Sequence, residues 1–279
     1  MDKSAREIKT ERALEELKCL IIDGDIVCGE ELKESKLQKQ LKLSRAPIRT
    51  AITSLVNEGL AVQEGRTCKV IRPSDEELVI LFGIRLMLET MVCAGLRRDF
   101  HDAPRFAHDK KTWSPQKKGD FRIQLEASIE QLQKSELPPR GDRFAFIQHD
   151  LKFHQLLIRH SKYKGMEPQL VRAFYATILS LPMKLLVESY ASDICNEHDE
   201  IVEALLSDKA GELDAARAMA SHLRSAFNRF FPVLQKDVAA TLEQTLAIDR
   251  DVLRTDSRRS PAAGKNATAK TSKVTKKAR

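Results

Sequence analysis

Residues 32–60, LKESKLQKQLKLSRAPIRTAITSLVNEGL, decide the fold of the first part of this 279-residue chain. The spacing of their apolar residues predicts two short helices joined by a tight turn. Ser44 stands where the second helix begins, and its hydroxyl can accept a hydrogen bond from the free backbone N–H groups of the first turn. An apolar stripe at helical spacing predicts a buried face on this helix, and it comprises Ile48, Ile52, Leu55 and Val56.

Two arginines on the second helix favour a surface that binds DNA. Arg45 and Arg49 are four residues apart, so both side chains project from one face. A guanidinium can bind guanine O6 and N7 with two hydrogen bonds, and a helix laid into a major groove needs such a side chain. Two arginines alone would be more typical of an ordinary charged, solvated helix. The surrounding charge favours DNA, because residues 33–49 hold six basic residues and one acid, Glu34.

Two strand-like runs follow the helix pair. Residues 61–64 and 68–71 flank Gly65 and Arg66, and this arrangement predicts a β-hairpin. Residues 5–24 carry apolar positions at helical spacing and end at Gly24, which predicts a preceding helix. Residues 1–72 are therefore expected to form a winged helix-turn-helix domain, with the hairpin as its wing.

This part of the chain resembles the DNA-binding domain of the GntR family of bacterial transcription regulators. The family pattern runs roughly G-E-x-L-x-E, then S-R-x-P-V-R-x-A, then L-x-x-E-G-L. It is matched at Gly29, Glu30, Leu32, Glu34, Leu37, Ser44, Arg45, Pro47, Arg49, Ala51, Leu55, Glu58, Gly59 and Leu60. Pro47 falls in the first turn of the helix, where its missing N–H costs nothing. Cys28 replaces a usual proline, Lys42 replaces a common turn glycine, and the wing has a single glycine.

Beyond Arg72-Pro73-Ser74 the patterns predict helices. Ser74 and the acids after it are typical of a helix start. Prolines and few apolar residues predict a loop at 99–119 and a second break at 137–141. Helical patterns occupy residues 78–91, 123–132, 144–161, 167–190, 193–207 and 211–231. Since no alternating strand pattern follows residue 72, residues 73–235 are expected to form an all-α antiparallel bundle, followed by an extension at 236–279.

One carboxylate and three imidazoles in this second part could bind a metal ion. Asp150 and His154 are four apart on one predicted helix face, while His198 and His222 lie on the two helices that follow. These side chains suit first-row divalent metals, and neutral imidazole with oxygen suits Zn²⁺. Spacing alone is a weak signal, because a chain with seven histidines is expected to contain some acid–His pair by chance.

These segments resemble the FCD ligand-binding domain of the FadR branch of the GntR family. The resemblance is carried by D-L-K-F-H, E-H-D-E-I-V-E-A-L and A-R-A-M-A-S-H-L. It implies a divalent metal, with Zn²⁺ favoured, held by Asp150, His154, His198 and His222, and a small organic acid whose carboxylate binds at that metal. Arg85, in R-L-M-L-E, is implied as a second contact for the acid. An ion pair between Arg85 and a neighbouring helix is an equally good interpretation.

The positive charge of the chain is concentrated in its tail. The formal net charge is +7, yet residues 254–279 contain nine basic residues and one acid, whereas residues 1–253 hold 38 basic and 39 acidic residues. The tail has almost no large apolar side chain and is expected to be disordered. It could add sequence-independent affinity for phosphates or act as a solubilising appendage.

Cysteine usage and the absence of a leader predict a cytoplasmic protein. The five cysteines are scattered and contain no C-x-x-C pair, which favours reduced thiols over a disulfide framework. The N-terminal segment is charged, and no run is expected to reach the ~20 apolar residues that cross a bilayer.

The two resemblances imply a metabolite-responsive transcription regulator and not an enzyme. A homodimer that represses catabolic genes from a short inverted repeat is expected. The residues expected at the DNA are Lys36, Ser44, Arg45, Pro47, Arg49, Gly65 and Arg66. Arg45 and Arg49 are the candidates for base contacts, and Lys36, Ser44 and Arg66 for phosphate contacts. The alternatives are a metal-dependent hydrolase at the Asp/His cluster, disfavoured because no glutamate base is evident by motif, and an architectural DNA-binding protein driven by the tail.

Overall fold

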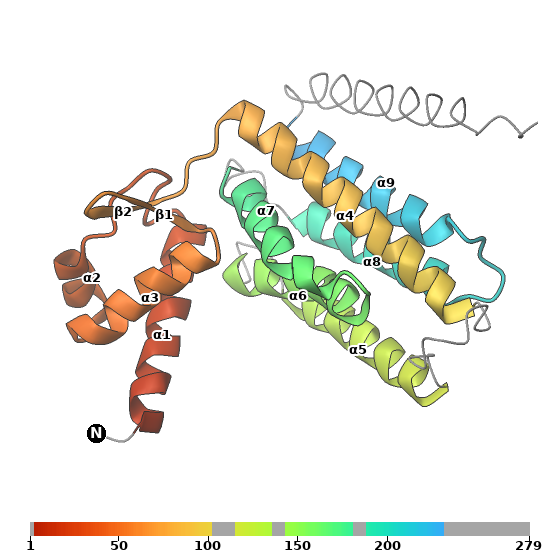
Figure 1. Cartoon of the computed structure of the whole chain (residues 1–279), viewed down its shortest axis with the longest axis horizontal. Coiled ribbons are helices and arrows are strands. Elements are labelled where there is room, and N and C mark those ends of the chain that lie inside the picture. Colours follow the sequence, from red (N-terminus) through yellow and green to blue (C-terminus); the bar gives the residue numbers. More distant parts are fainter. Residues whose placement is uncertain (1–2, 102–114, 136–142, 181–187, 232–279) are drawn as a thin grey trace, which may run out of the picture. The chain divides into compact units, whose positions relative to one another are not determined.

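The computed structural model describes residues 3–101, 115–135, 143–180 and 188–231. Three helices and a two-stranded hairpin come first, and helices follow (Figure 1). The first group is α1 (Lys3–Ile22), α2 (Glu34–Leu41), α3 (Arg45–Asn57), β1 (Ala61–Glu64) and β2 (Thr67–Val70). The second group is α4 (Asp75–His101), α5 (Pro115–Lys134), α6 (Arg143–His160), the short 3₁₀ helix η1 (Lys164–Met166), α7 (Glu167–Leu179), α8 (Glu188–Leu206) and α9 (Asp214–Phe230). The extension expected at 236–279 lies outside the described residues.

The first group has its own small core. α3 packs on α1 and α2, and Ile48 and Leu55 of α3 are fully buried beside Leu17 and Leu37. The apolar stripe predicted for α3 is therefore its packed face. The opposite face carries Arg45 and stays exposed.

The predicted wing is present as an antiparallel hairpin. Ala61 pairs with Val70 and Glu64 with Thr67, which leaves a two-residue turn. Gly65 opens this turn with a φ of +59°, a value that glycine adopts without steric cost. The second strand begins at Thr67, one residue earlier than the pattern predicted.

The turn between α2 and α3 departs from expectation at two residues. Lys42 has a φ of +53°, a left-handed conformation that side chains other than glycine rarely adopt. Ser44 occupies the N-cap position of α3 with extended backbone, as predicted, but its hydroxyl makes no capping hydrogen bond. The predicted side-chain cap at Ser44 is therefore wrong, and the hydroxyl is left exposed at the helix start.

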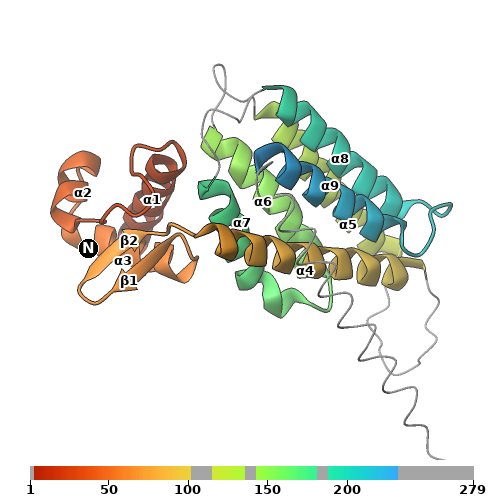
Figure 2. The same ribbon diagram turned by 90° about the horizontal axis from the view of Figure 1, so that it is seen from above.

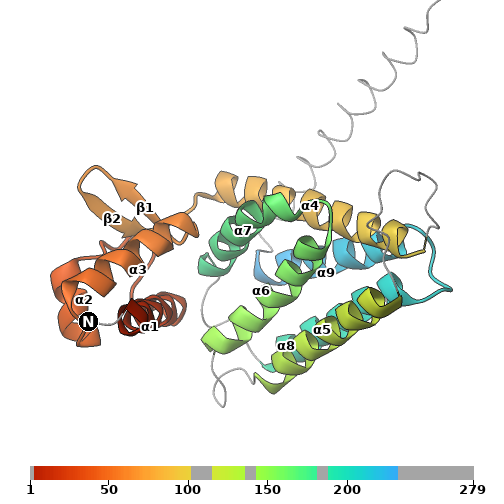
Figure 3. The ribbon, with the colours of Figure 1, turned by 60° about the horizontal axis from the view of Figure 1, so that its bottom comes forward.

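The second group closes a helical bundle, as predicted. α4 packs on α9 and α7, α9 on α8, α8 on α5, and α5 on α6. Figure 2 shows α4 running along α9, and Figure 3 shows α5 beside α8. The start of α4 is fixed by a capping box, in which the Ser74 N–H donates to Glu77 (2.8 Å) and the Glu77 N–H donates to the Ser74 hydroxyl (3.2 Å).

Several helix boundaries differ from those predicted. α4 continues through His101 and α5 begins at Pro115, so the loop expected at 99–119 is shorter at both ends. Proline is well suited to the first position of a helix, where its missing N–H is not needed. The helix expected at 167–190 ends at Leu179, and α8 begins at Glu188, before the predicted residue 193.

α4 also corrects the expectation that no run is long and apolar enough to cross a membrane. By length and composition α4 meets that criterion, but half of its apolar window is buried inside the protein. Its centre carries Arg85 and Glu89, and both charged side chains are buried in the bundle. α4 therefore has the packing of a core helix.

Candidate functional site

The exposed face of α3 borders a polar groove. Residues of α2, α3 and the wing line it, among them Gln38, Arg45, Arg49, Gln63 and Arg66. The side chains of Arg45 and Arg49 are 68% and 61% exposed, so their guanidinium groups face solvent. The structure thus brings the two predicted arginines and the wing tip together on one concave surface.

Glu34 also belongs to this surface, although the sequence analysis gave it no part in DNA binding and named it only as the one acid of residues 33–49 and as a match to the family pattern. Its carboxylate accepts from Arg45 Nε at 2.5 Å and from Arg49 Nε at 2.8 Å, with a longer contact to Arg49 Nη2 at 3.3 Å. Hydrogen bonds from Arg49 and then Arg45 lower the pKa of Glu34 to about 2. The carboxylate therefore stays ionised and holds both guanidinium groups mainly by their Nε edges.

The other residues predicted at the DNA have different environments. Lys36 is 57% exposed and pairs with Glu30 at 2.7 Å. Gly65 and Arg66 are exposed at the wing tip. Pro47 is buried, so it belongs to the packed side of α3 and not to the surface. Its ring can shape the start of the helix but is not available to a ligand.

The four residues predicted to bind a metal come together inside the bundle. Asp150 and His154 lie on α6, His198 on α8 and His222 on α9, and all four side chains are buried. Asp150 Oδ1 lies 3.4 Å from His198 Nε2 and 3.7 Å from His154 Nε2, and the four potential ligand atoms all lie within 4.8 Å of one another. Two ligands bound to a tetrahedral zinc at about 2.1 Å are roughly 3.4 Å apart. The cluster is therefore compact enough for one ion.

The protonation and pairing of these groups also fit a metal ion. Burial lowers the pKa of His198 well below its usual value, so this imidazole is neutral and can donate a lone pair. Asp150 Oδ1, His154 Nε2 and both ring nitrogens of His198 are buried, and they have no hydrogen-bond partner among the described residues. Buried polar atoms without partners are costly, and a divalent cation would satisfy them. The cluster can hold a metal ion.

Two glutamates that orient the histidines were missed by the sequence analysis. Glu89 of α4 contacts His154 Nδ1, and Glu197 of α8 lies 2.8 Å from His222 Nδ1. A carboxylate at Nδ1 leaves Nε2 facing the cluster, an arrangement typical of metal-binding histidines. The signals were present, since Glu89 ends the R-L-M-L-E motif and Glu197 precedes His198, but sequence alone does not show which histidine each glutamate meets.

The pKa values of both glutamates are lowered by neighbouring cationic groups despite burial. Burial would raise the pKa of Glu89, but Arg85 and His154 outweigh burial and lower that pKa to about 2. Burial would likewise raise the pKa of Glu197, and His222 with Arg229 lowers it instead. Both carboxylates are therefore ionised and able to accept from the histidines.

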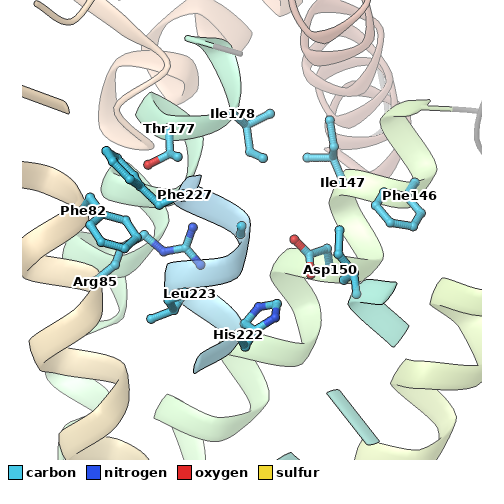
Figure 4. A pocket seen from close by; sticks show the side chains of 12 residues that line it. Phe82, Arg85, Phe146, Ile147, Asp150, Thr177, Ile178, His222, Leu223 and Phe227 are labelled. Atoms are coloured by element: carbon cyan, nitrogen blue, oxygen red, sulfur yellow. The ribbon is translucent and has the colours of Figure 1, made fainter. Parts of the chain in front are cut away.

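Arg85 makes an ion pair and also lines a cavity beside the cluster. Its Nε donates to Glu89 at 2.8 Å on the same helix, and its guanidinium lies 4.9 Å from the centre of the Phe174 ring. The predicted alternative was a pair with a neighbouring helix, whereas the partner is on α4 itself. Figure 4 shows the guanidinium of Arg85 and the carboxylate of Asp150 pointing toward the same space from α4 and α6.

Comparison with known families finds a match in each of the two groups of elements. Residues 9–70 match the family described as bacterial regulatory proteins of the gntR family, and residues 116–225 match the FCD domain. The chain belongs to the GntR family of bacterial regulatory proteins, and its helical bundle is an FCD domain.

Two relatives are both described as a gluconate operon transcriptional repressor. The protein from Bacillus licheniformis is 28% identical over 144 residues, which are 52% of this chain and about half (51%) of that repressor. The protein from Bacillus subtilis (strain 168) is 24% identical over 200 residues, 70% of this chain and 74% of the repressor. Among solved structures, E. coli McbR/YncC has the same fold, with a TM-score of 0.55 and 17% identity over 78% of this chain and 95% of that one.

Proposed function

We propose that this protein is a metabolite-responsive repressor that binds operator DNA through α3 and the wing. The observation that carries the proposal is the polar groove in which Arg45, Arg49 and Arg66 meet on the exposed side of a packed helix. A helix held by its apolar face, with guanidinium groups on the other face, is suited to a major groove. The two Bacillus repressors support the regulatory assignment.

Each surface residue has a proposed part in DNA binding. Arg45 and Arg49 read guanine edges, because Glu34 binds both guanidinium groups mainly at Nε and leaves the terminal nitrogens of Arg45 and Nη1 of Arg49 without a bond to it. Lys36, Ser44 and Arg66 bind phosphates and set the register without reading sequence. Gly65 permits the wing turn, and buried Pro47 shapes the helix start.

A homodimer would present two copies of this surface to DNA. Two-fold symmetry in the protein then requires an inverted repeat in the operator, with half-sites about one helical turn apart or less. The proposed domains are residues 1–72 for DNA binding and 73–235 for the effector and metal, with 236–279 as an extension.

The effector part of the proposal rests on the buried cluster. Asp150, His154, His198 and His222 would hold a divalent metal, with Zn²⁺ favoured because three imidazoles and one carboxylate suit it. A bound metal would supply positive charge for the carboxylate of a small organic acid, and Arg85 supplies a second cation. The acid alters DNA binding only if it binds one arrangement of the protein more tightly than the other.

The recognition surface is tested by Arg45→Ala on duplexes selected from a random library with the wild-type protein. Loss of a bidentate arginine–guanine contact costs about 1–3 kcal/mol, so specific affinity should fall roughly 10- to 100-fold. Fluorescence anisotropy measures this loss, and size-exclusion chromatography with circular dichroism checks that the variant is folded.

Arg122→Ala is the matched control for this experiment. Arg122 is an exposed arginine of α5 that pairs with Glu126 at 3.1 Å, and it does not line the groove. The control should bind selected duplexes as the wild type does. Unchanged affinity in Arg45→Ala would contradict the proposed recognition surface.

A further inference from the structure

The cavity beside the metal-binding cluster has a charged end and an apolar body. The charged side chains of Arg85 and Asp150 lie at one end together with the imidazole of His222 (Figure 4). The body is formed by aromatic and aliphatic side chains that are at least 95% buried, from α4, α6, α8 and α9; these are Phe82, Phe146, Ile147, Ile194, Leu223 and Phe227.

Uncharged hydrogen-bonding groups are scarce in this cavity. Among the described residues that line it, Thr177 is the one uncharged polar side chain besides His222 of the metal-binding cluster. The Thr177 hydroxyl donates to the backbone oxygen of Ala173 at 2.8 Å, so its hydrogen is already used within α7. The described part of the lining therefore offers a ligand almost no uncharged partners for hydroxyl groups.

We infer that the acid bound in this pocket is a monocarboxylate with an apolar body, and not a polyhydroxylated sugar acid. The inference rests on the proposed function, in which the cluster and Arg85 bind the carboxylate. An aliphatic or aromatic body would then contact the apolar walls and leave water. A sugar acid would lose the water bound to its hydroxyls and gain no partners for them. The pocket of this chain thus points away from the sugar acid for which its Bacillus relatives are named.

Hexanoate and gluconate provide a matched test, because both are six-carbon monocarboxylates that differ in five hydroxyl groups. Isothermal titration calorimetry of the full-length, zinc-loaded protein should give an affinity for hexanoate at least about 10-fold higher than for gluconate. The metal content is measured after each titration, so that metal removed by either acid is detected. Equal or tighter binding of gluconate, or no binding of either acid, overturns the inference.

A chain-length series separates burial of the body from binding of the carboxylate alone. Each methylene transferred from water into an apolar site increases affinity roughly fourfold. Affinity should therefore rise from acetate through butyrate to hexanoate. A flat series would show that the apolar walls do not contact the ligand, and it would also overturn the inference.

A pair of variants tests the wall itself. Ile178 of α7 lines the cavity and is only partly buried, so Ile178→Asn should fold while weakening hexanoate more than acetate. Ile123→Asn is the control, because Ile123 is 64% exposed on α5 and lies outside the cavity. Equal weakening of both acids by Ile178→Asn would contradict the assignment. Should this variant fail to fold, the series on the wild-type protein still decides.

The failure of this inference is distinguishable from the failure of the proposed function. Preference for gluconate together with Arg45-dependent DNA binding would refute the effector class and leave the regulator intact. Binding of hexanoate without sequence-specific DNA binding would refute the regulator and retain the ligand class.

Discussion

At the scale of single residues, Glu34 has a double effect on the DNA-facing surface. Its carboxylate holds Arg45 and Arg49 at once, which limits the side-chain conformations that both arginines must lose on binding. It also places a negative charge where phosphates approach. Glu34 should therefore favour end-on contacts with guanine over diffuse contacts with the DNA backbone.

Glu34→Gln should raise affinity for random duplexes and lower the ratio of specific to random binding. Removal of the charge releases the guanidinium groups to any phosphate. The free energy of unfolding should change by less than about 1 kcal/mol, because the ion pairs are exposed. Anisotropy titrations at several salt concentrations measure the ratio. The control is Glu126→Gln, which breaks a comparable exposed pair on α5 and should leave the ratio of specific to random binding unchanged. An unchanged ratio in Glu34→Gln would show that this carboxylate has no part in discrimination.

The residues around the buried cluster should differ in how strongly they affect metal binding. His198→Ala removes one of the four proposed ligands, so the purified variant should carry less metal than the wild type. Glu197→Gln leaves all four ligands but weakens the group that orients His222, which typically costs about 10- to 100-fold in metal affinity. Elemental analysis and competition with a chelator measure both effects. His149→Ala, on α6 outside the cluster, is the control.

Thermal denaturation provides a second readout of the same site. A ligand present at about 100 times its dissociation constant stabilises a protein by about 2.7 kcal/mol. Stripping the metal from the wild type should lower the melting temperature by about 5–10 °C. His198→Ala should show no such shift. Wild-type protein that carries no metal when purified from zinc-supplemented cells would refute the site.

At the scale of elements, the turn between α2 and α3 carries strain that a single substitution can relieve. Lys42 adopts a left-handed φ of +53°, which costs a non-glycine residue about 1–2 kcal/mol. Lys42→Gly should relieve this strain and stabilise the protein. The gain should not exceed about 1 kcal/mol, because glycine also increases the entropy of the unfolded chain, which offsets part of the relief. Urea denaturation measures the change.

Lys39→Gly is the matched control, with the opposite expected sign. Lys39 is exposed within α2, where glycine destabilises a helix by about 1 kcal/mol. Destabilisation by both substitutions would show that the turn is not strained at Lys42.

At the scale of the whole molecule, deletion of the tail distinguishes a sequence-specific regulator from an architectural DNA-binding protein. Residues 254–279 carry nine basic residues and one acid, while the rest of the chain is nearly neutral. A regulator that reads sequence through α3 should keep its preference for selected duplexes when these residues are deleted. Only the sequence-independent affinity and its dependence on salt should decrease.

The deletion variant is compared with a full-length variant in which the basic residues of the tail are replaced by glutamine. Both proteins should show a smaller slope of log affinity against log salt than the wild type, with the same ratio of specific to random binding. Loss of that ratio would favour an architectural protein driven by its tail.

Short-range patterns were sufficient to predict most elements of this protein. Helical spacing identified α3 and its buried stripe, and Ser74 with Glu77 identified the start of α4. Such signals act over one or two turns, so the sequence contains them directly. The four residues of the cluster required the family resemblance, because their spacing alone was ambiguous.

Tertiary structure alone decided how distant charges meet. Glu34 joins Arg45 and Arg49 across the turn, and Glu89 reaches His154 on another helix. The apolar body of the cavity beside the cluster is likewise assembled from helices far apart in the chain. Local periodicity specifies which face of each helix is buried, whereas the partners on that face depend on how the helices pack, and packing is a property of the folded chain.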